Sequence, residues 1–180
     1  MIPEEIRLGS RLIRLVRGDI TAEHVDAIVN ATNASLRAGG GVCGAIYAAA
    51  GPALAEDARR VMADRGPLTP GEAVATVAGD LHARYVIHAL GPVWHGGEQS
   101  EAEALANAYR NSIKLADALG LQSIAFPSIS TGIYGYPLMN AAHVALRTLR
   151  DALKNATSVR EVHVVLFDQR TYDTWLGAAR

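Results

Sequence analysis

The sequence predicts an α/β fold, a three-layer α/β/α sandwich, and two observations lead to this prediction. Short runs rich in β-branched and apolar residues alternate with segments whose apolar residues recur at helical spacing. Most of the strand-like runs are apolar along nearly their whole length, which is typical of strands buried on both faces. A sheet of such strands needs helices on each side, and this requirement gives three layers.

The strand-like runs are short and are bounded by polar residues or by glycine. Residues 11–18 mix apolar side chains with arginine, and this pattern predicts an outer strand. The remaining runs are more uniformly apolar, β-branched or aromatic, and each has the length of a strand. They span residues 26–31, 73–79, 85–90, 123–128 and 161–167.

Helical spacing of apolar residues marks the segments between these runs. One helix is expected to begin at Ser100, where Glu103 completes a capping-box pattern, and to end at Gly120. A second helix is expected from about Leu138 to Lys154. Shorter helices are predicted over residues 42–50, 52–65 and 169–178.

Length and composition limit the function classes. The 180 residues suit one domain, which we expect to span residues 1–180, and a hydrophobic content of 49% predicts a packed core. A formal net charge of −1 provides no basic surface for duplex nucleic acid or an anionic membrane. The single cysteine excludes an internal disulfide. The N-terminal stretch lacks the apolar segment of a secretory signal, so we expect a soluble cytoplasmic protein.

Three consecutive glycines, at positions 39–41, stand directly before a predicted helix. Glycine lets a ligand lie against bare backbone, and a helix start offers unpaired N–H groups and a positive dipole end. Together these features can bind an anion, most commonly phosphate. The loop has neither a lysine nor P-loop spacing, so the main chain itself would bind the anion. The alternative is a tight turn that brings the helix close to the preceding strand.

The connection after the strand at 123–128 repeats this mixture of glycine and small hydroxyl residues, with Ser130, Thr131, Gly132 and Gly135. Ligands of open α/β sheets bind at the carboxyl ends of the strands. Two such loops at neighbouring strand ends predict a diphosphate held between them. An ordinary connection into the next helix is the alternative.

Two further residues stand at the edges of predicted strands. Asp19, in the sequence GDIT, is either a turn or helix-capping residue or a ligand contact. Phe167 ends the last predicted strand, where an aromatic ring is either part of the core or a platform for a base. The histidines show no metal-binding spacing, so His88 and His163 are expected to be satisfied residues of the sheet. We expect no metal and no cofactor.

Six blocks of the sequence, taken in order, resemble a macro domain of the MacroD-type branch over essentially the whole chain. They read GDIT, VDAIVNATN, GGGVCGAIYAAAG, PLTPGEAVAT, YVIHALGPVWHGG and FPSISTGIYGYP. The resemblance implies the same three-layer sandwich, with a mixed and mostly parallel central sheet. It also implies a protein that binds ADP-ribose. Many members of this family remove ADP-ribose from proteins or nucleic-acid ends, or deacetylate O-acetyl-ADP-ribose.

The resemblance implies roles for individual residues. Asp19 and the backbone of Ile20 would bind the adenine edge, and Phe167 would stack on the ring. Asn33 would hold the hydroxyls of the distal ribose, whereas Asn30 would stabilise the loop. Main-chain N–H groups of both loops would bind the diphosphate; the loop residues are Gly40, Gly41, Val42 and Cys43, and Ser130, Thr131, Gly132, Ile133 and Tyr134.

Two positions depart from the MacroD-type pattern. Cys43 stands where the pattern has an aspartate, and Tyr47 stands where it commonly has a histidine. The resemblance implies that this aspartate orients or activates the water that attacks the anomeric carbon of the distal ribose. A thiol, with an ordinary pKa of ~8.5, cannot replace that carboxylate as a base in the same way. Cys43 is therefore either a thiolate favoured by the helix start or a small residue that packs beside the loop.

Two functions remain open. The first is a slow hydrolase of aspartate- or glutamate-linked mono-ADP-ribose, or of O-acetyl-ADP-ribose, with Asn33 and Cys43 as candidate catalytic residues. Some macro domains without the aspartate still hydrolyse ADP-ribosyl esters, because an asparagine positions the ribose and a substrate phosphate oxygen accepts the proton. The second is a non-catalytic ADP-ribose reader. The expected partner is ADP-ribose or a protein that carries it, with no membrane, and nucleic acid only where its end carries ADP-ribose.

Overall fold

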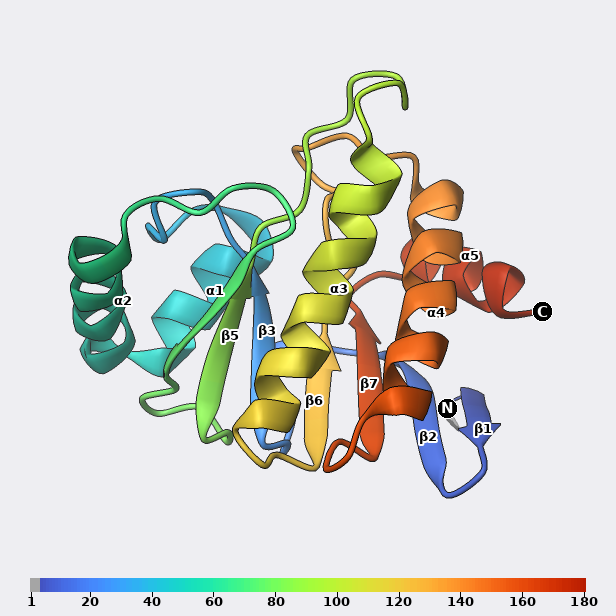
Figure 1. The fold of residues 1–180 in the computed structure, drawn as a ribbon, viewed down its shortest axis with the longest axis horizontal. Helices are drawn as coiled ribbons and strands as arrows, with labels where there is room; N and C mark the ends of the chain where they lie inside the picture. Colours follow the sequence, from blue (N-terminus) through green and yellow to red (C-terminus); the bar gives the residue numbers. More distant parts are fainter. Residues whose placement is uncertain (1–3) are drawn as a thin grey trace.

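The computed structural model describes residues 4–180, with a seven-stranded sheet as the middle layer (Figure 1). The strand order is β1-β2-β7-β6-β3-β5-β4. The strands are Glu4–Leu8 (β1), Arg11–Arg17 (β2), Ala27–Ala31 (β3), Ala73–Val77 (β4), Tyr85–Ala89 (β5), Ser123–Phe126 (β6) and Glu161–Leu166 (β7). The five central strands run parallel, and β1 and β4 at the two edges run antiparallel to their neighbours. The predicted mixed, mostly parallel sheet is confirmed.

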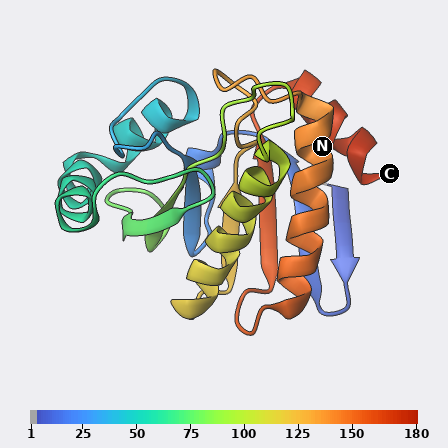
Figure 2. The ribbon, with the colours of Figure 1, turned by 45° about the horizontal axis from the view of Figure 1, so that its top comes forward.

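Helices cover both faces of this sheet (Figures 1 and 2). They are α1 (Gly41–Ala50), α2 (Pro52–Arg65), α3 (Glu101–Ala118), α4 (Leu138–Asn155) and α5 (Gln169–Ala179), with a short 3-10 helix, η1 (Ile20–Ala22). Helices α3, α4 and α5 share one hydrophobic core with the sheet, and α1 and α2 share another on the opposite face. The predicted three-layer sandwich is therefore confirmed. None of the helices within residues 4–180 is both long and apolar enough to cross a membrane.

Each core fixes one side of the sheet. Phe126 and Trp175 are fully buried in the larger core, and Ile28 and Ile46 are fully buried in the smaller one. Full burial of an aliphatic or aromatic side chain stabilises a fold by about 1.5–3 kcal/mol. Since both faces are packed in this way, the loops at the strand ends extend from a rigid support.

The strand predicted to be an outer strand is not the edge of the sheet. Residues 11–17 form β2, and β1 pairs with it in antiparallel register on the outside. Arg14 of β2 forms ion pairs with Glu5 at 3.1 Å and with Glu161 at 3.2 Å. Arg14 therefore lies on the face of the sheet that carries these carboxylates, whereas Arg11 lies on the opposite face, where it donates to Leu153 O of α4. Residues 1–3, which belong to the N-terminal stretch considered above, lie outside the described residues.

The predicted capping box at the start of α3 is wrong. Ser100 has a left-handed φ of 58° and its side chain makes no capping hydrogen bond. Instead the Glu101 carboxylate accepts the N–H groups of His95, Gly97 and Gln99 at 2.8, 2.9 and 2.6 Å. These donors, with His95 contributing most, lower the pKa of Glu101 to about 2. The predicted end is right, because Gly120 follows the helix with a left-handed φ of 72°.

The connection between β3 and α1 lies directly against the helix. A Cβ atom added at Gly44 would lie 2.3 Å from the carbonyl oxygen of Gly39. Any side chain at this position would push the loop and the helix apart, since the nearest atom is backbone. Glycine at position 44 is therefore required for this close approach.

His163 of β7 lies between two carboxylates, on the face of the sheet that α4 does not cover. Its Nδ1 is 2.9 Å from Glu23 Oε2, and its Nε2 is 2.7 Å from Glu161 Oε1. Burial lowers the pKa of His163, but the two carboxylates outweigh burial and raise that pKa above its ordinary value. A histidine whose pKa is raised by folding stabilises the fold below its unfolded pKa. This contribution is lost as the pH rises through the folded pKa.

Gly44→Ala is expected to destabilise the fold by about 1–3 kcal/mol, because the added methyl group must displace backbone. Gly177→Ala in α5 is the matched control, since the nearest atom to its added Cβ is the flexible end of Met139 at 3.6 Å. There the better helix propensity of alanine should stabilise the fold by about 0.5–1 kcal/mol. Urea denaturation measures both values. Equal free energies of unfolding in the two variants would contradict the role of Gly44.

His163→Gln is expected to lower the free energy of unfolding by on the order of 1 kcal/mol near pH 6 and by clearly less near pH 9. The reason is that only protonated histidine forms charged pairs with both carboxylates. Urea denaturation of wild type and variant across this pH range measures the difference. His143→Gln, at an exposed position of α4, is the control, and it should change the free energy of unfolding only slightly at both pH values. A pH-independent loss in His163→Gln would argue against the charged pairs.

Candidate functional site

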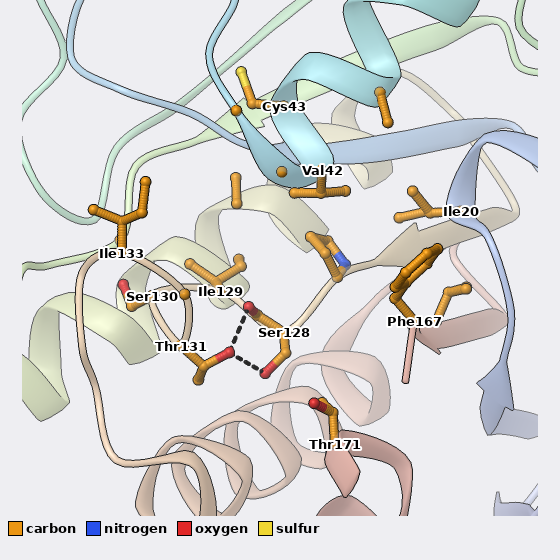
Figure 3. A pocket seen from close by; sticks show the side chains of 18 of the residues that line it. Ile20, Val42, Cys43, Ser128, Ile129, Ser130, Thr131, Ile133, Phe167 and Thr171 are labelled. Carbon is orange, nitrogen blue, oxygen red and sulfur yellow. Dashed lines mark hydrogen bonds between the residues drawn. The ribbon is translucent and has the colours of Figure 1, made fainter. Parts of the chain in front are cut away.

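The carboxyl ends of the parallel strands open into a cavity of about 700 Å³. A cavity of this size suits a small-molecule ligand of nucleotide dimensions. The glycine loop and the start of α1 form one wall, and residues 128–134 of the second loop form the facing wall (Figure 3). Every predicted site residue lines it: Asp19, Ile20, Asn33, Gly40, Gly41, Val42, Cys43, Ser130, Thr131, Gly132, Ile133, Tyr134 and Phe167. Their contacts with a ligand remain a prediction.

The start of α1 presents unpaired main-chain donors to this cavity. No side chain caps the helix at Gly40, and the first bond of its opening turn runs from Gly44 N to Gly40 O at 3.2 Å. The N–H groups of Gly41, Val42 and Cys43 consequently have no acceptor among residues 4–180. These three donors, together with the positive end of the helix dipole, favour a bound anion.

The facing loop presents a second set of donors. The N–H groups of the consecutive residues 130–134 have no acceptor in the described part of the chain. Ser130 has a left-handed φ of 67°, and such a residue within a turn is typical of main-chain nests that bind anions. The Thr131 hydroxyl bonds to the backbone oxygen and the hydroxyl of Ser128 at 3.1 and 2.9 Å, which fixes the loop (Figure 3).

The fold does not require glycine at positions 40 and 132. Gly40 has a φ of −85°, which any residue adopts, and Gly132 is not in the left-handed region. A Cβ atom added at either position would meet no atom within 4 Å. Both residues line the cavity, and because glycine has no side chain, neither residue fills space that a ligand could occupy.

At one end of the cavity, Asp19, Ile20 and Phe167 lie together. Asp19 caps η1, since its Oδ1 accepts the Thr21 N–H at 2.9 Å and the Thr21 hydroxyl at 2.7 Å. It is thus a capping residue and a cavity residue at once. Phe167 is 80% exposed and therefore is not part of the core. Its ring lies open beside the buried Ile20, as a platform for a planar group requires (Figure 3).

Asn33, near the other end, is almost fully bonded to its own loop. Its Oδ1 accepts the Ser35 N–H at 3.2 Å, the Ser35 hydroxyl at 3.1 Å and the Arg37 N–H at 3.0 Å. Its Nδ2 donates to Arg37 O at 2.8 Å. One amide hydrogen remains free. In this conformation, Asn33 can therefore donate only one hydrogen bond to the ribose hydroxyls that it is predicted to contact.

Cys43 is 6% exposed and contacts two polar groups. Its Sγ lies 3.6 Å from Arg37 O and 3.6 Å from the Asn30 Nδ2. Both contacts fit a neutral thiol, because the S–H donates to the carbonyl and the sulfur accepts from the amide. A thiolate has no proton to donate to Arg37 O. Of the two alternatives, the geometry therefore favours the packed, neutral thiol.

Asn30 begins a buried chain of hydrogen bonds that the sequence did not indicate. Its Nδ2 donates to His88 Nδ1 at 3.1 Å, and His88 Nε2 donates to the Thr76 hydroxyl at 2.9 Å, which in turn donates to Val77 O at 3.0 Å. Burial lowers the pKa of His88 to about 4, so the ring is neutral near pH 7. This chain crosses β3, β5 and β4 and holds Asn30 beside Cys43. His88 is the satisfied sheet histidine that was expected.

Four further polar side chains line the cavity without having been predicted there: Thr32, Ser128, Asp168 and Thr171. Asp168 caps α5 by accepting the Thr171 N–H at 2.8 Å. In the sequence, only the position of Asp168 directly after Phe167 indicated that it could line the cavity. The carboxylates among the cavity-lining residues are Asp19 and Asp168, and both lie at the Phe167 end. The lining near Asn33 and Cys43 therefore contains no carboxylate.

Known proteins resemble this chain along most of its length. Residues 29–145 match the family model described as Macro domain. The chain is 51% identical, over 92% of its length, to a macro domain-containing protein of Caldanaerobacter subterraneus, of which 94% is covered. It is 53% identical, over 87% of its length, to a Klebsiella pneumoniae protein named O-acetyl-ADP-ribose deacetylase, of which 90% is covered.

Solved structures share the fold. The Oceanobacillus iheyensis macrodomain with ADP matches with a TM-score of 0.93 at 40% identity, covering 98% of this chain and 94% of that one. The Trypanosoma brucei macrodomain in complex with ADP-ribose matches with a TM-score of 0.84 at 37% identity, covering 93% of this chain and 69% of that one. The fold, the family match and these identities together show that the chain belongs to the macro domain family.

Proposed function

We propose that this chain, as a single macro domain, binds ADP-ribose in the cavity and slowly hydrolyses ADP-ribosyl linkages. The substrates would be proteins with mono-ADP-ribose on aspartate or glutamate, or O-acetyl-ADP-ribose. The observation that carries the proposal is the pair of facing N–H sets at residues 41–43 and 130–134, which have no acceptor within residues 4–180. The relatives named as deacetylases and the macrodomain with ADP-ribose support it.

The ends of the cavity supply the remaining contacts of the ligand. The two N–H sets hold the diphosphate in the middle, where main-chain dipoles replace cationic side chains. Adenine lies at the Phe167 end, stacked on that ring and bonded to the free oxygen of Asp19. The distal ribose then reaches Asn33, which donates its remaining amide hydrogen. This order follows from the chemistry that each part of the lining offers.

Hydrolysis has to proceed without a carboxylate at the distal ribose. The Cys43 thiol, whose S–H bonds to Arg37 O, does not supply a base in place of that carboxylate. A phosphate oxygen of the substrate, held by the two loops, would instead accept the proton of the attacking water. Catalysis would then come from positioning and from fixed N–H donors. Because a general base typically contributes ~10²–10⁴-fold to a rate, we expect slow turnover.

A non-catalytic reader of ADP-ribose is the second candidate. One observation favours it, namely that the cavity lining beside Asn33 and Cys43 contains no carboxylate. The two candidates share the same binding chemistry and differ only in turnover.

Gly132→Glu is expected to weaken ADP-ribose binding by roughly 100-fold or more, because a carboxylate beside the diphosphate repels it. The added side chain meets no protein atom within 4 Å of its Cβ, so the fold should be retained. Isothermal titration calorimetry with ADP-ribose measures the affinity. Gly177→Glu adds the same charge to α5, outside the cavity, and should bind as wild type does. Undiminished binding by Gly132→Glu would refute the placement of the diphosphate.

Wild-type protein is expected to release ADP-ribose from O-acetyl-ADP-ribose slowly, but faster than Gly132→Glu does. The variant is the control for spontaneous hydrolysis, because it should fold but not bind. Chromatography of the reaction mixture measures the product over time. Equal rates for the two proteins, combined with tight ADP-ribose binding by wild type, would establish the reader instead of the hydrolase.

A further inference from the structure

Two side chains of α1 donate to consecutive carbonyl groups of the loop that precedes this helix. The Cys43 S–H donates to Arg37 O at 3.6 Å, and the Tyr47 hydroxyl donates to Leu36 O. Cys43 and Tyr47 are four residues apart, so they lie on the same face of the helix. They are also the two positions that depart from the expected sequence pattern. The two departures thus act on one segment, residues 33–37.

This segment determines the position of Asn33. Arg37 uses both its N–H and its carbonyl oxygen on the Asn33 side chain, at 3.0 and 2.8 Å. Leu36 has a left-handed φ of 55°, a conformation that leucine rarely adopts and that needs support from its surroundings. Its side chain is buried with Leu68 and Leu90. A shift of the carbonyl groups at 36 and 37 would therefore move Asn33 as well.

We propose that Cys43 and Tyr47 are positioning residues that hold Asn33 at the distal end of the cavity. They act by fixing residues 33–37 against α1, and so they set the affinity for the part of the ligand beyond the diphosphate. The inference rests on the proposed function. Tyr47 does not line the cavity, so an effect of its hydroxyl on the ligand has to pass through the loop.

The chemistry of the two donors fits this role. Burial, with a smaller contribution from Cys43, raises the pKa of Tyr47 to about 12, so its hydroxyl keeps its proton. Arg37 O already accepts one hydrogen bond from Asn33 and has a second lone pair for the thiol. An aspartate at position 43 would face this carbonyl without a proton to donate. In the present loop conformation, a carboxylate at position 43 therefore could not donate the hydrogen bond to Arg37 O that holds the loop against α1.

The test compares the affinities of wild type and variant for two ligands, one with the distal ribose and one without it. Tyr47→Phe keeps the ring and removes the hydroxyl, so we expect ADP-ribose affinity to fall by roughly 3- to 10-fold, the usual effect of a lost neutral hydrogen bond. The affinity for ADP, which lacks the distal ribose, should stay within about twofold. Calorimetry of both ligands gives both values. Tyr85→Phe is the control, because the Tyr85 hydroxyl makes no hydrogen bond within residues 4–180 and lies outside the cavity.

Cys43 variants provide an independent arm that does not depend on the stability of Tyr47→Phe. Cys43→Ala should lose ADP-ribose affinity in the same selective way, whereas Cys43→Ser retains a donor and should recover most of it. Thermal unfolding of each variant verifies that it is folded.

Three outcomes overturn the inference. Equal losses of ADP-ribose and ADP affinity would indicate a general structural role, and no loss in Tyr47→Phe and Cys43→Ala would remove the positioning role. Failure of Cys43→Ser to improve on Cys43→Ala would show that the donor is not what matters. A wild-type protein that binds neither ligand would overturn the proposed function itself, and this result is distinct from the other three.

Discussion

The cavity depends on main-chain N–H groups that have no acceptor among the described residues and that lie at the carboxyl ends of the parallel strands. The parallel pairing of β3 with β6 brings the carboxyl ends of both strands to the same edge. Each end leads into a connection that exposes consecutive donors, at residues 41–43 and 130–134. The two packed cores hold these connections apart at a fixed spacing. A protein with a net charge of −1 can therefore offer donors to an anion without basic side chains.

The layers and most elements could be predicted from the sequence because burial on both faces leaves a clear apolar pattern. Two details could not. Residues 4–8 begin with two glutamates, which are depleted in strands, and form β1 by pairing with β2, so local propensity does not reveal them. The start of α3 depends on Glu101, whose carboxylate bonds to a loop that the sequence pattern does not describe.

The location of the candidate site followed from the glycines and the helix start, which are local features. The bonding state of its polar residues did not, because it depends on contacts formed in three dimensions. Asn33 donates to Arg37 O, and Cys43 donates to the same carbonyl. His88 forms hydrogen bonds with both Asn30 and Thr76. These contacts change what the residues can do chemically. A sequence pattern names a residue type, whereas its free donors and acceptors are determined by the fold.

The buried histidine has a consequence for acid tolerance. Folding depresses the pKa of His88 to about 4, so the unfolded chain takes up a proton more readily than the native one below pH ~6.5, and acid favours unfolding there. His163 acts in the opposite sense, because folding raises its pKa. The stabilisation by His163 is complete below pH ~6.5, whereas the loss through His88 continues down to about pH 4. At lower pH, protonation of carboxylates whose pKa folding lowers, such as Glu101, removes further stabilisation. Acid therefore weakens the fold in two steps, first through an imidazole and then through carboxylates.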